Sequence, residues 1–143
     1  LGIEVARSSA GIMLCQRKSA LDIVSEVGFL GCEPSPTPME LHPLLSDEDS
    51  PLLADPGRYR RLIGRLVYLV VTQPDLAYSV HILSQYMHAL REYHWDAALR
   101  VVRYLKGCPG QGLLLRSNVD LLLSGWCDAD YNSCSNTRRS VTG

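Results

Sequence analysis

The chain has 143 residues, which fits one ordinary domain or two small pieces, and 46% of them are hydrophobic, which is enough for a buried core. Its 14 basic and 15 acidic side chains leave a net charge of -1, which excludes a strong overall attraction to nucleic acid or to a membrane surface. The 5 cysteines form no C-x-x-C pair and no long apolar run occurs, so we expect no disulfide framework, zinc ribbon or membrane span. With no signal peptide present, we expect an intracellular, reducing setting.

The first part of the chain predicts a β-hairpin, a helix and a linker. Ile3 and Val5 alternate with small or charged residues, and the stretch SSAG at residues 8–11 supplies turn chemistry. Helical spacing then places four apolar side chains on one face of a helix that Gly28 would cap. These are Ala20, Ile23, Val24 and Val27. Residues 32–57 hold six of the eight prolines, which predicts an extended linker because proline disfavours helix.

Three helices are predicted next. The first covers residues 58–72 and has a broad apolar face. Pro74 and Asp75 suit the start of the second, because proline fits the first helical position and a carboxylate is favourable at the positive helix end. The third covers residues 92–107 and stops at Gly107. The residues expected to face inward are Leu62, Ile63, Leu66, Leu69, Val70, Leu76, Val80, Leu83, Met87, Trp95, Ala98, Leu99, Val102 and Leu105.

The last part of the chain predicts strands. Residues 113–130 predict two strands joined near Asn118 and Asp120, and residues 137–143 resemble the start of another. Hairpin, helices and strands together predict an α+β fold. The sequence opens on leucine rather than methionine and stops within an expected strand, so we expect a fragment of a longer protein.

The first of the three helices is rich in arginine and is a candidate nucleic-acid-binding element. Arg60, Gly64 and Tyr68 are spaced i, i+4, i+8 and share one stripe, and Arg65 belongs to the same basic helix. A mid-helix glycine costs roughly 1 kcal/mol against alanine, but it removes a side chain where a partner comes close. The arginines would meet phosphate and the tyrosine a sugar or base. The alternative is a solvated basic face whose glycine packs against a neighbouring helix.

Five stretches cover nearly the whole chain and together resemble one known family. They are LGIEVARSSAGIMLCQRKSALDIV, CEPSPTPME, YRRLIGRLVYLVVTQPDLAYSVHILSQYM, HWDAALRVVRYLKGCPGQGLLL and GWCDADYNSCSNTRRSVTG. In the same order they resemble part of the Pol polyprotein of copia-type retrotransposons. The resemblance implies the end of a reverse transcriptase, an RNA-directed DNA polymerase, running into a ribonuclease H domain.

The resemblance also implies four parts and their partners. Residues 1–31 would be the end of the polymerase palm, with a hairpin like the primer grip, and residues 32–57 the linker. Residues 58–107 would form the helical thumb and connection, whose first helix follows the minor groove of the template–primer duplex. Residues 108–143 would be the truncated start of a ribonuclease H-like domain. The implied partners are an RNA–DNA hybrid or template–primer duplex and the rest of the polyprotein, in the cytoplasm (in a virus-like particle) or nucleus, with no membrane.

Two aspartates follow an apolar run near the end of the chain. The resemblance implies that Asp128 is a catalytic metal ligand of the ribonuclease H in the parent protein, where two Mg²⁺ ions are held by several carboxylates. Asp130 lies two positions on, on the same face of a regular strand, and would assist as a metal ligand. The alternative is that both form a turn where a strand stops. The resemblance places the remaining carboxylates of both active sites outside this chain, so we expect no activity from it alone.

Three kinds of function stay open. The chain would be a fragment that positions the template–primer duplex, a non-catalytic remnant acting as an interaction module, or a stand-alone binder of RNA–DNA hybrids. His81, His88 and His94 are expected to be ordinary surface or half-buried residues, because the first pair is too widely spaced to chelate a metal and no third ligand is evident.

Overall fold

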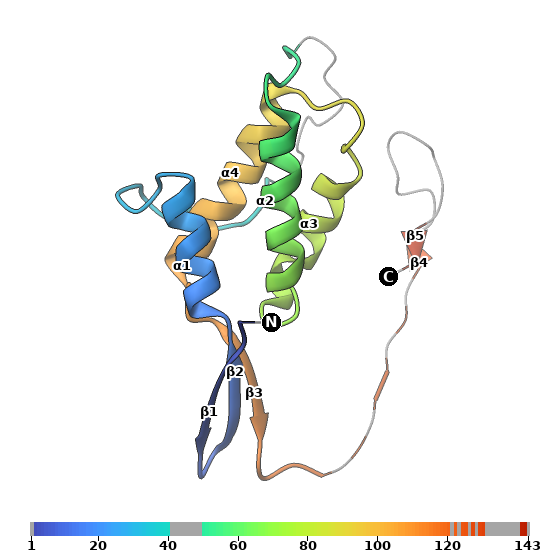
Figure 1. Cartoon of the computed structure of the whole chain (residues 1–143). Helices are drawn as coiled ribbons and strands as arrows, with labels where there is room; N and C mark the ends of the chain where they lie inside the picture. Colours follow the sequence, from blue (N-terminus) through green and yellow to red (C-terminus); the bar gives the residue numbers. More distant parts are fainter. Residues whose placement is uncertain are drawn as a thin grey trace.

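Helices and a small antiparallel sheet make up the structure, a computed structural model that describes residues 2–40 and 50–120, with positions 122, 124, 125, 127, 129, 130, 141 and 142. Figure 1 shows helices α1 to α4 packed together, with the sheet β1-β2-β3 projecting from one end. This mixture confirms the predicted α+β fold class. Within the described part of the chain, no helix is both long and apolar enough to cross a membrane.

The N-terminal hairpin forms as predicted, with β1 at Glu4–Ser8 and β2 at Gly11–Cys15. Glycine is required at position 11, where φ is +143° and an added Cβ would lie 2.1 Å from the carbonyl oxygen of Leu115. A third strand, β3 at Gly112–Arg116, pairs antiparallel with β2 and completes the order β1-β2-β3. The hairpin therefore becomes a sheet through a strand from the far end of the helical region.

The position of β3 corrects one expectation. We predicted that residues 113–130 form two strands joined to each other, but β3 pairs with the hairpin instead. The short strand β4 at Ala129–Asp130 pairs with β5 at Val141–Thr142. Residues 112–116, which the predicted division grouped with the later segment, thus share a sheet with the N-terminal part. A local pattern shows that a strand forms but not which distant strand it pairs with.

The helix α1 covers Arg17–Glu26 and begins directly after β2. Ala20, Ile23 and Val24 are buried on its inner face, as their spacing predicted. The chain leaves the helix through Gly28, whose φ of +79° favours glycine, and its N–H donates to the carbonyl oxygen of Ser25 over 3.0 Å.

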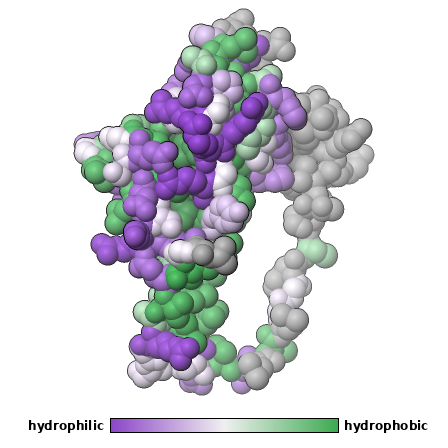
Figure 2. Space-filling view, in the orientation of Figure 1, coloured by the Kyte–Doolittle hydropathy of each residue, from purple (hydrophilic) through white to green (hydrophobic). Residues whose placement is uncertain are grey.

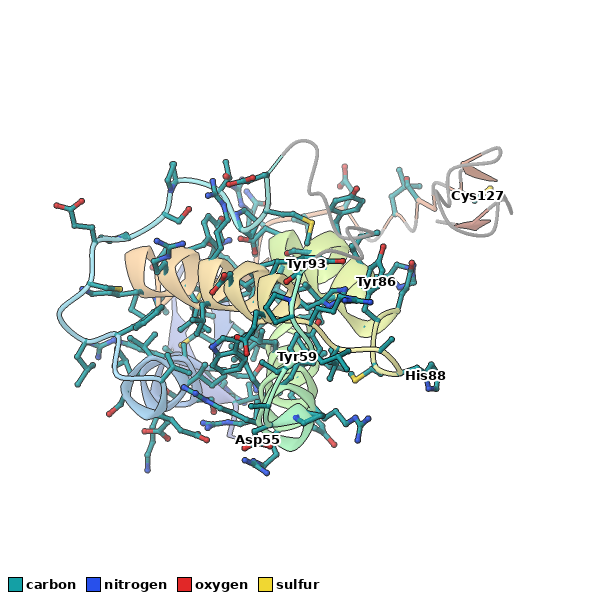
Figure 3. The ribbon with its side chains drawn as sticks, turned by 90° about the horizontal axis from the view of Figure 1, so that it is seen from above. Asp55, Tyr59, Tyr86, His88, Tyr93 and Cys127 are labelled. Atoms are coloured by element: carbon teal, nitrogen blue, oxygen red, sulfur yellow. The ribbon has the colours of Figure 1, made fainter. Side chains whose placement is uncertain are left out.

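The helix α2 covers Pro56–Leu69 and starts two residues before the predicted position. Asp55 explains the earlier start, because its carboxylate accepts a hydrogen bond of 3.0 Å from the backbone N–H of Arg58, and Pro56 suits the first turn. Figure 3 shows Asp55 at this end of the helix and Tyr59 among the helices. Tyr59 is fully buried, and its hydroxyl donates to the carbonyl oxygen of Leu83 over 2.8 Å.

The two remaining helices follow the predicted positions with one difference. The predicted second helix opens as a 3-10 turn at Pro74–Leu76 and continues as α3 at Ala77–Ser84. The third, α4, covers Glu92–Gly107, as its apolar spacing and terminal glycine predicted. One hydrophobic core joins all four helices. Val101 belongs to it although it was not predicted, whereas Val70, Met87 and Leu99 are only partly buried against it.

Residues 32–40 and 50–55 of the proline-rich linker contain no helix or regular strand, but the last two predicted linker residues, Pro56 and Gly57, belong to α2. The backbone N–H of Ser35 donates to the carbonyl oxygen of Arg103 over 3.3 Å, and Arg100 contacts Glu40 at 3.1 Å. Nearer α2, the N–H of Leu53 donates to the carbonyl oxygen of Leu90 over 2.9 Å. Both described parts of the linker are therefore held against the bundle.

Replacement of Leu66 by alanine tests the role of the buried side of α2. Leu66 is fully buried, whereas its neighbour Val67 is half exposed. Leu66→Ala is expected to lower the free energy of unfolding by about 2–5 kcal/mol, through lost burial and a cavity. Val67→Ala is the matched control and should change it by less than about 0.5 kcal/mol. Urea denaturation followed by circular dichroism measures both, and equal losses would contradict the assignment of the core side.

Candidate nucleic-acid interface

The solvent-facing side of α2 carries a narrow stripe of residues opposite the core. Gly64 and Tyr68 lie in the middle of this side, and Tyr68 is 64% exposed. Arg61 precedes them by three and seven positions and therefore lies on the same side of the helix. We name Arg61, Gly64 and Tyr68 the α2 stripe. Two of its members, Gly64 and Tyr68, were predicted to bind nucleic acid.

Arg60 lies at one margin of the stripe and holds α2 to the segment after α3. Its Nη2 donates to the carbonyl oxygen of Met87 over 3.0 Å. A carbonyl accepts the hydrogen bond but does not neutralise the guanidinium, so Arg60 is exposed and charged at this margin. The side chain thus has a structural contact, and its predicted contact with phosphate stays a prediction.

Arg65 lies at the other margin and faces α1. Its guanidinium is paired with the carboxylate of Glu26. Both side chains are partly exposed, so this pair contributes roughly 0–1 kcal/mol and is weakened by salt. A phosphate would compete with Glu26 for the guanidinium, and the predicted role of Arg65 in binding also stays a prediction.

The other two arginines of α2 differ in how firmly they are held. The guanidinium carbon of Arg58 lies 4.1 Å from the centre of the Trp95 ring, a cation–π contact that fastens α2 to α4. Arg61 approaches the exposed carboxylate of Asp55 at 3.9 Å, which is a weak pair in water. Arg61 is therefore well placed to meet an external anion. Its spacing from Gly64 could have identified it in the sequence, because i and i+3 share a helix face.

No neighbouring residue in the described structure requires a glycine at position 64. A Cβ added there would meet nothing within 4 Å outside the helix's own nearby backbone. The alternative in which this glycine lets a neighbouring helix come close is therefore not what the described residues show. The bare backbone at Gly64 instead faces open space between Arg61 and Tyr68, where an external partner can approach closely.

A hollow of about 350 Å³ opens between α1 and α2 beside the stripe. Its lining residues are Gln16, Ser19, Asp22, Ile23, Arg65, Tyr68 and Leu69. Tyr68 therefore borders both the stripe and the hollow. The carboxylate of Asp22 disfavours a phosphate in the hollow but accepts hydrogen bonds from hydroxyl groups such as those of a sugar. Ser19 and Asp22 were not predicted as site residues, because they come from a different helix.

Three groups have pKa values raised by their surroundings: Tyr59, Tyr104 and Cys108. Burial raises the pKa of the Tyr59 hydroxyl, which stays protonated and donates to the backbone. A hydrogen bond of 2.6 Å to Asp75 raises the pKa of the Tyr104 hydroxyl, and burial adds to the effect. Burial likewise raises the pKa of the Cys108 thiol. None of these groups is brought closer to ionisation at neutral pH.

The histidines lie in three different environments. His94 is buried between the rings of Tyr86 and Tyr93, whose centres lie 4.6 and 4.4 Å from its own. His81 contacts Gln85 at 3.1 Å on the surface, and Figure 3 shows His88 pointing away from the helices. Across residues 2–40 and 50–120 and the few described later positions, no group of three or more histidine, cysteine, aspartate or glutamate side chains is arranged to hold a metal.

The predicted magnesium site is largely outside the described residues. Asp128 is not among them, and for Asp130 the structure describes the backbone in β4, which pairs with Val141 of β5. The roles predicted for the two carboxylates therefore stay predictions.

Curated relatives match the whole chain. The retrovirus-related Pol polyprotein from transposon RE2 of Arabidopsis thaliana is 41% identical over 143 residues, which is 100% of this chain and 10% of the relative. The polyprotein from transposon RE1 of the same plant is 40% identical over 92% of this chain and 9% of the relative. An uncharacterized mitochondrial protein of that plant is 38% identical over 100% of this chain and 59% of its own length. No family model and no solved structure matches the chain.

Substitution of Gly64 by alanine tests whether the glycine is needed inside the fold. Because the added methyl group meets open space, Gly64→Ala should raise the free energy of unfolding by up to about 1 kcal/mol through helix propensity. Gly28→Ala is the control, since its methyl group also meets open space but its φ of +79° is strained. That variant should lose about 1 kcal/mol. A destabilised Gly64→Ala chain in urea titrations would show that the glycine has an internal role.

Proposed function

Since the chain belongs to the retrovirus-related Pol polyproteins of copia-type retrotransposons, we propose that it is a piece of their reverse transcriptase and ribonuclease H region that holds the template–primer duplex on α2. The chain spans about a tenth of the length of the two Pol polyproteins, so the rest of such a polyprotein is its proposed partner. In this proposal residues 1–31 end the palm and residues 58–107 form the thumb and connection. The segment after β3 begins the nuclease.

The single observation that supports duplex binding is the open backbone at Gly64 between an exposed cation and an exposed aromatic ring. The minor groove of an A-form duplex is wide and shallow and displays sugar hydroxyls, so a helix can approach it with a bare backbone patch. Arg61 would then meet a phosphate and Tyr68 a sugar. Arg60 and Arg65, at the two margins, would add positive charge on either side.

The hollow beside Tyr68 extends this surface toward α1. A nucleotide sugar in the groove would meet Tyr68 first, with Ser19 and Asp22 behind it. Phosphates would stay on the side of Arg61, because Asp22 repels them. The charge pattern of the two helices would thus orient one strand of the duplex.

Magnesium belongs to the nuclease part of the proposal. Carboxylate oxygens are ligands that Mg²⁺ prefers, and Asp128 would hold the ion in the complete protein with Asp130 beside it. A bound Mg²⁺ would supply charge stabilisation for phosphodiester cleavage.

Binding of a fluorescein-labelled RNA–DNA hybrid of about 20 base pairs, followed by anisotropy at several salt concentrations, tests the duplex proposal. Arg61→Ala should weaken binding several-fold and lower the slope of log K against log salt by about 0.9, the amount for one phosphate contact. Arg103→Ala, an exposed arginine on α4, is the matched control and should leave the slope unchanged.

Gly64→Leu gives the sharper variant, because leucine is a good helix former, its Cβ would meet nothing within 4 Å and the rest of its side chain would occupy the approach path. Binding should fall by at least about tenfold, or roughly 1.4 kcal/mol, while thermal stability is retained. Unchanged hybrid binding by Gly64→Leu would mean that α2 faces protein or solvent. No salt-dependent binding at all would favour a non-catalytic remnant.

We further expect that the chain by itself hydrolyses no RNA strand. Within the described part no carboxylate cluster is present, and a two-metal site needs several carboxylates. Incubation with labelled hybrid and Mg²⁺, resolved on a denaturing gel, should show background cleavage only. Metal-dependent cleavage that disappears in Asp128→Asn would refute this expectation and establish an active site in the chain.

A further inference from the structure

Two hydroxyl residues, each followed by proline, lie close together in the linker beside α4. Ser35 precedes Pro36, and Thr37 precedes Pro38. Proline disfavours helix at the residue before it, and residues 32–40 contain no helix or regular strand. Figure 1 shows this segment, in cyan, leaving α1 and running past α4. Such a segment can enter the active site of a modifying enzyme without the unfolding of a helix or sheet.

The two hydroxyl residues differ in how firmly they are held. Ser35 is partly buried, and its hydroxyl donates to the carbonyl oxygen of Thr37 over 2.9 Å. The backbone N–H of Ser35 is engaged as well, because it donates to the carbonyl oxygen of Arg103 over 3.3 Å. Thr37, in contrast, is exposed. Thr37 is therefore the more accessible of the two acceptors.

The guanidinium of Arg100 lies directly beside the hydroxyl of Thr37. Its Nη2 donates to Oγ1 of Thr37 over 3.1 Å, and its Nη1 donates to the carboxylate of Glu40 over 3.1 Å. The Nε of the same side chain is buried and has no hydrogen-bond partner among the described residues. A guanidinium has five N–H donors, so Arg100 can bond further acceptor oxygens at the position of the Thr37 hydroxyl.

Two more cations follow Arg100 on the linker side of α4. Arg103 is exposed, and the ammonium group of Lys106 donates to the carbonyl oxygen of Cys32. Three exposed carboxylates lie in the same region. They are Glu33, Glu40 and Asp96. The charges in the region balance, and the one that touches the Thr37 hydroxyl is positive.

A phosphate group is strongly hydrated and suits a hydrophilic surface. On the face that Figure 2 shows, hydrophilic residues gather over the helices, whereas the projecting sheet is mostly hydrophobic. The helical bundle is therefore the part of the chain on which an added charge is favourable.

We propose that Thr37 is a phosphorylation site for a protein kinase that accepts proline directly after its target residue, and that the phosphate fixes the linker to α4 through Arg100. In the transfer, Oγ1 of Thr37 attacks the γ-phosphorus of ATP and forms the new O–P bond. The bond from that phosphorus to the bridging oxygen breaks, and ADP leaves with the electron pair. The hydroxyl proton passes to a base of the kinase, which also supplies ATP and Mg²⁺.

The phosphate strengthens the contact with Arg100. Phosphothreonine carries about -1.5 to -2 charges at pH 7 and three acceptor oxygens. Hydrogen bonds between an arginine and a phosphate are roughly twice as strong as neutral ones. Glu40, whose carboxylate shares Arg100, is displaced because like charges repel. Since the linker joins α1 to α2, the modification adds a fixed point on α4 between these two helices. This inference does not depend on duplex binding by α2.

A recombinant proline-directed serine/threonine kinase with ATP and Mg²⁺ tests the site on the complete 143-residue chain. Mass spectrometry follows the rates at Ser35 and Thr37, and a synthetic peptide of residues 30–42 is the unfolded reference. Thr37 should react at least about fivefold faster than Ser35 in the folded chain and differ from it by less than about threefold in the peptide, because the fold holds Ser35 with two hydrogen bonds. No modification of Thr37 in the folded chain, or equal rates there, would overturn the proposal.

Phosphorus-31 NMR over a pH titration tests the contact with Arg100. A neighbouring positive charge favours the doubly charged phosphate, so its second pKa should lie below that of the phosphorylated peptide, by an amount equal to an about threefold or greater loss of proton affinity. Arg100→Gln should return the pKa to the peptide value. Arg103→Gln, which removes an exposed charge from the same helix, is the matched control and should keep most of the difference.

The comparison of the wild-type chain with the peptide needs no variant, so it decides the result even if Arg100→Gln does not fold. A phosphate pKa in the wild-type chain equal to that of the peptide would overturn the proposed contact. A lowered pKa that Arg100→Gln and Arg103→Gln reduce equally would also overturn it, in favour of a general effect of the basic side of α4.

Discussion

The buried side of α2 is the constraint on which the rest of the structure depends. Its inward residues are Tyr59, Leu62, Ile63, Leu66 and Leu69, none more than 6% exposed. The helix α2 contacts each of the other three helices, as α4 does, so these two helices form the centre of the bundle. Because one side of an α-helix is fixed against this core, the opposite side has to face solvent. The position of the α2 stripe is therefore a consequence of packing.

Three of the four arginines of α2 hold the helix against neighbouring elements. Arg58 stacks on Trp95, Arg60 donates to a backbone carbonyl beyond α3, and Arg65 pairs with α1. These contacts orient α2 relative to each of its neighbours. They also keep positive charge at the edges of the helix, so the surface around Gly64 is basic even though the whole chain has a net charge of -1. A local field of this kind attracts phosphate without a basic protein.

The sheet and the helical bundle differ in how much of their apolar surface they bury. The bundle buries most of its apolar side chains in one core, whereas no residue of the sheet belongs to that core and Val5, Leu114 and Leu115 are about half exposed. The exposed side of α2 thus carries arginine around Gly64, whereas the exposed side chains of the sheet include the aliphatic Val5, Leu114 and Leu115.

The sequence by itself determined the local elements, because periodicity and capping act over a few residues. These elements are the hairpin, four helical segments, the helix ends at Gly28 and Gly107, and most of the core. It also determined the family. Only the tertiary structure decided that β3 joins the hairpin, that Arg60 and Arg65 contact other elements while Arg61 faces outward, and that Ser19 and Asp22 border Tyr68. These depend on which distant segments pack together, and a helical spacing fixes the relative angles of side chains but not the direction in which the core lies.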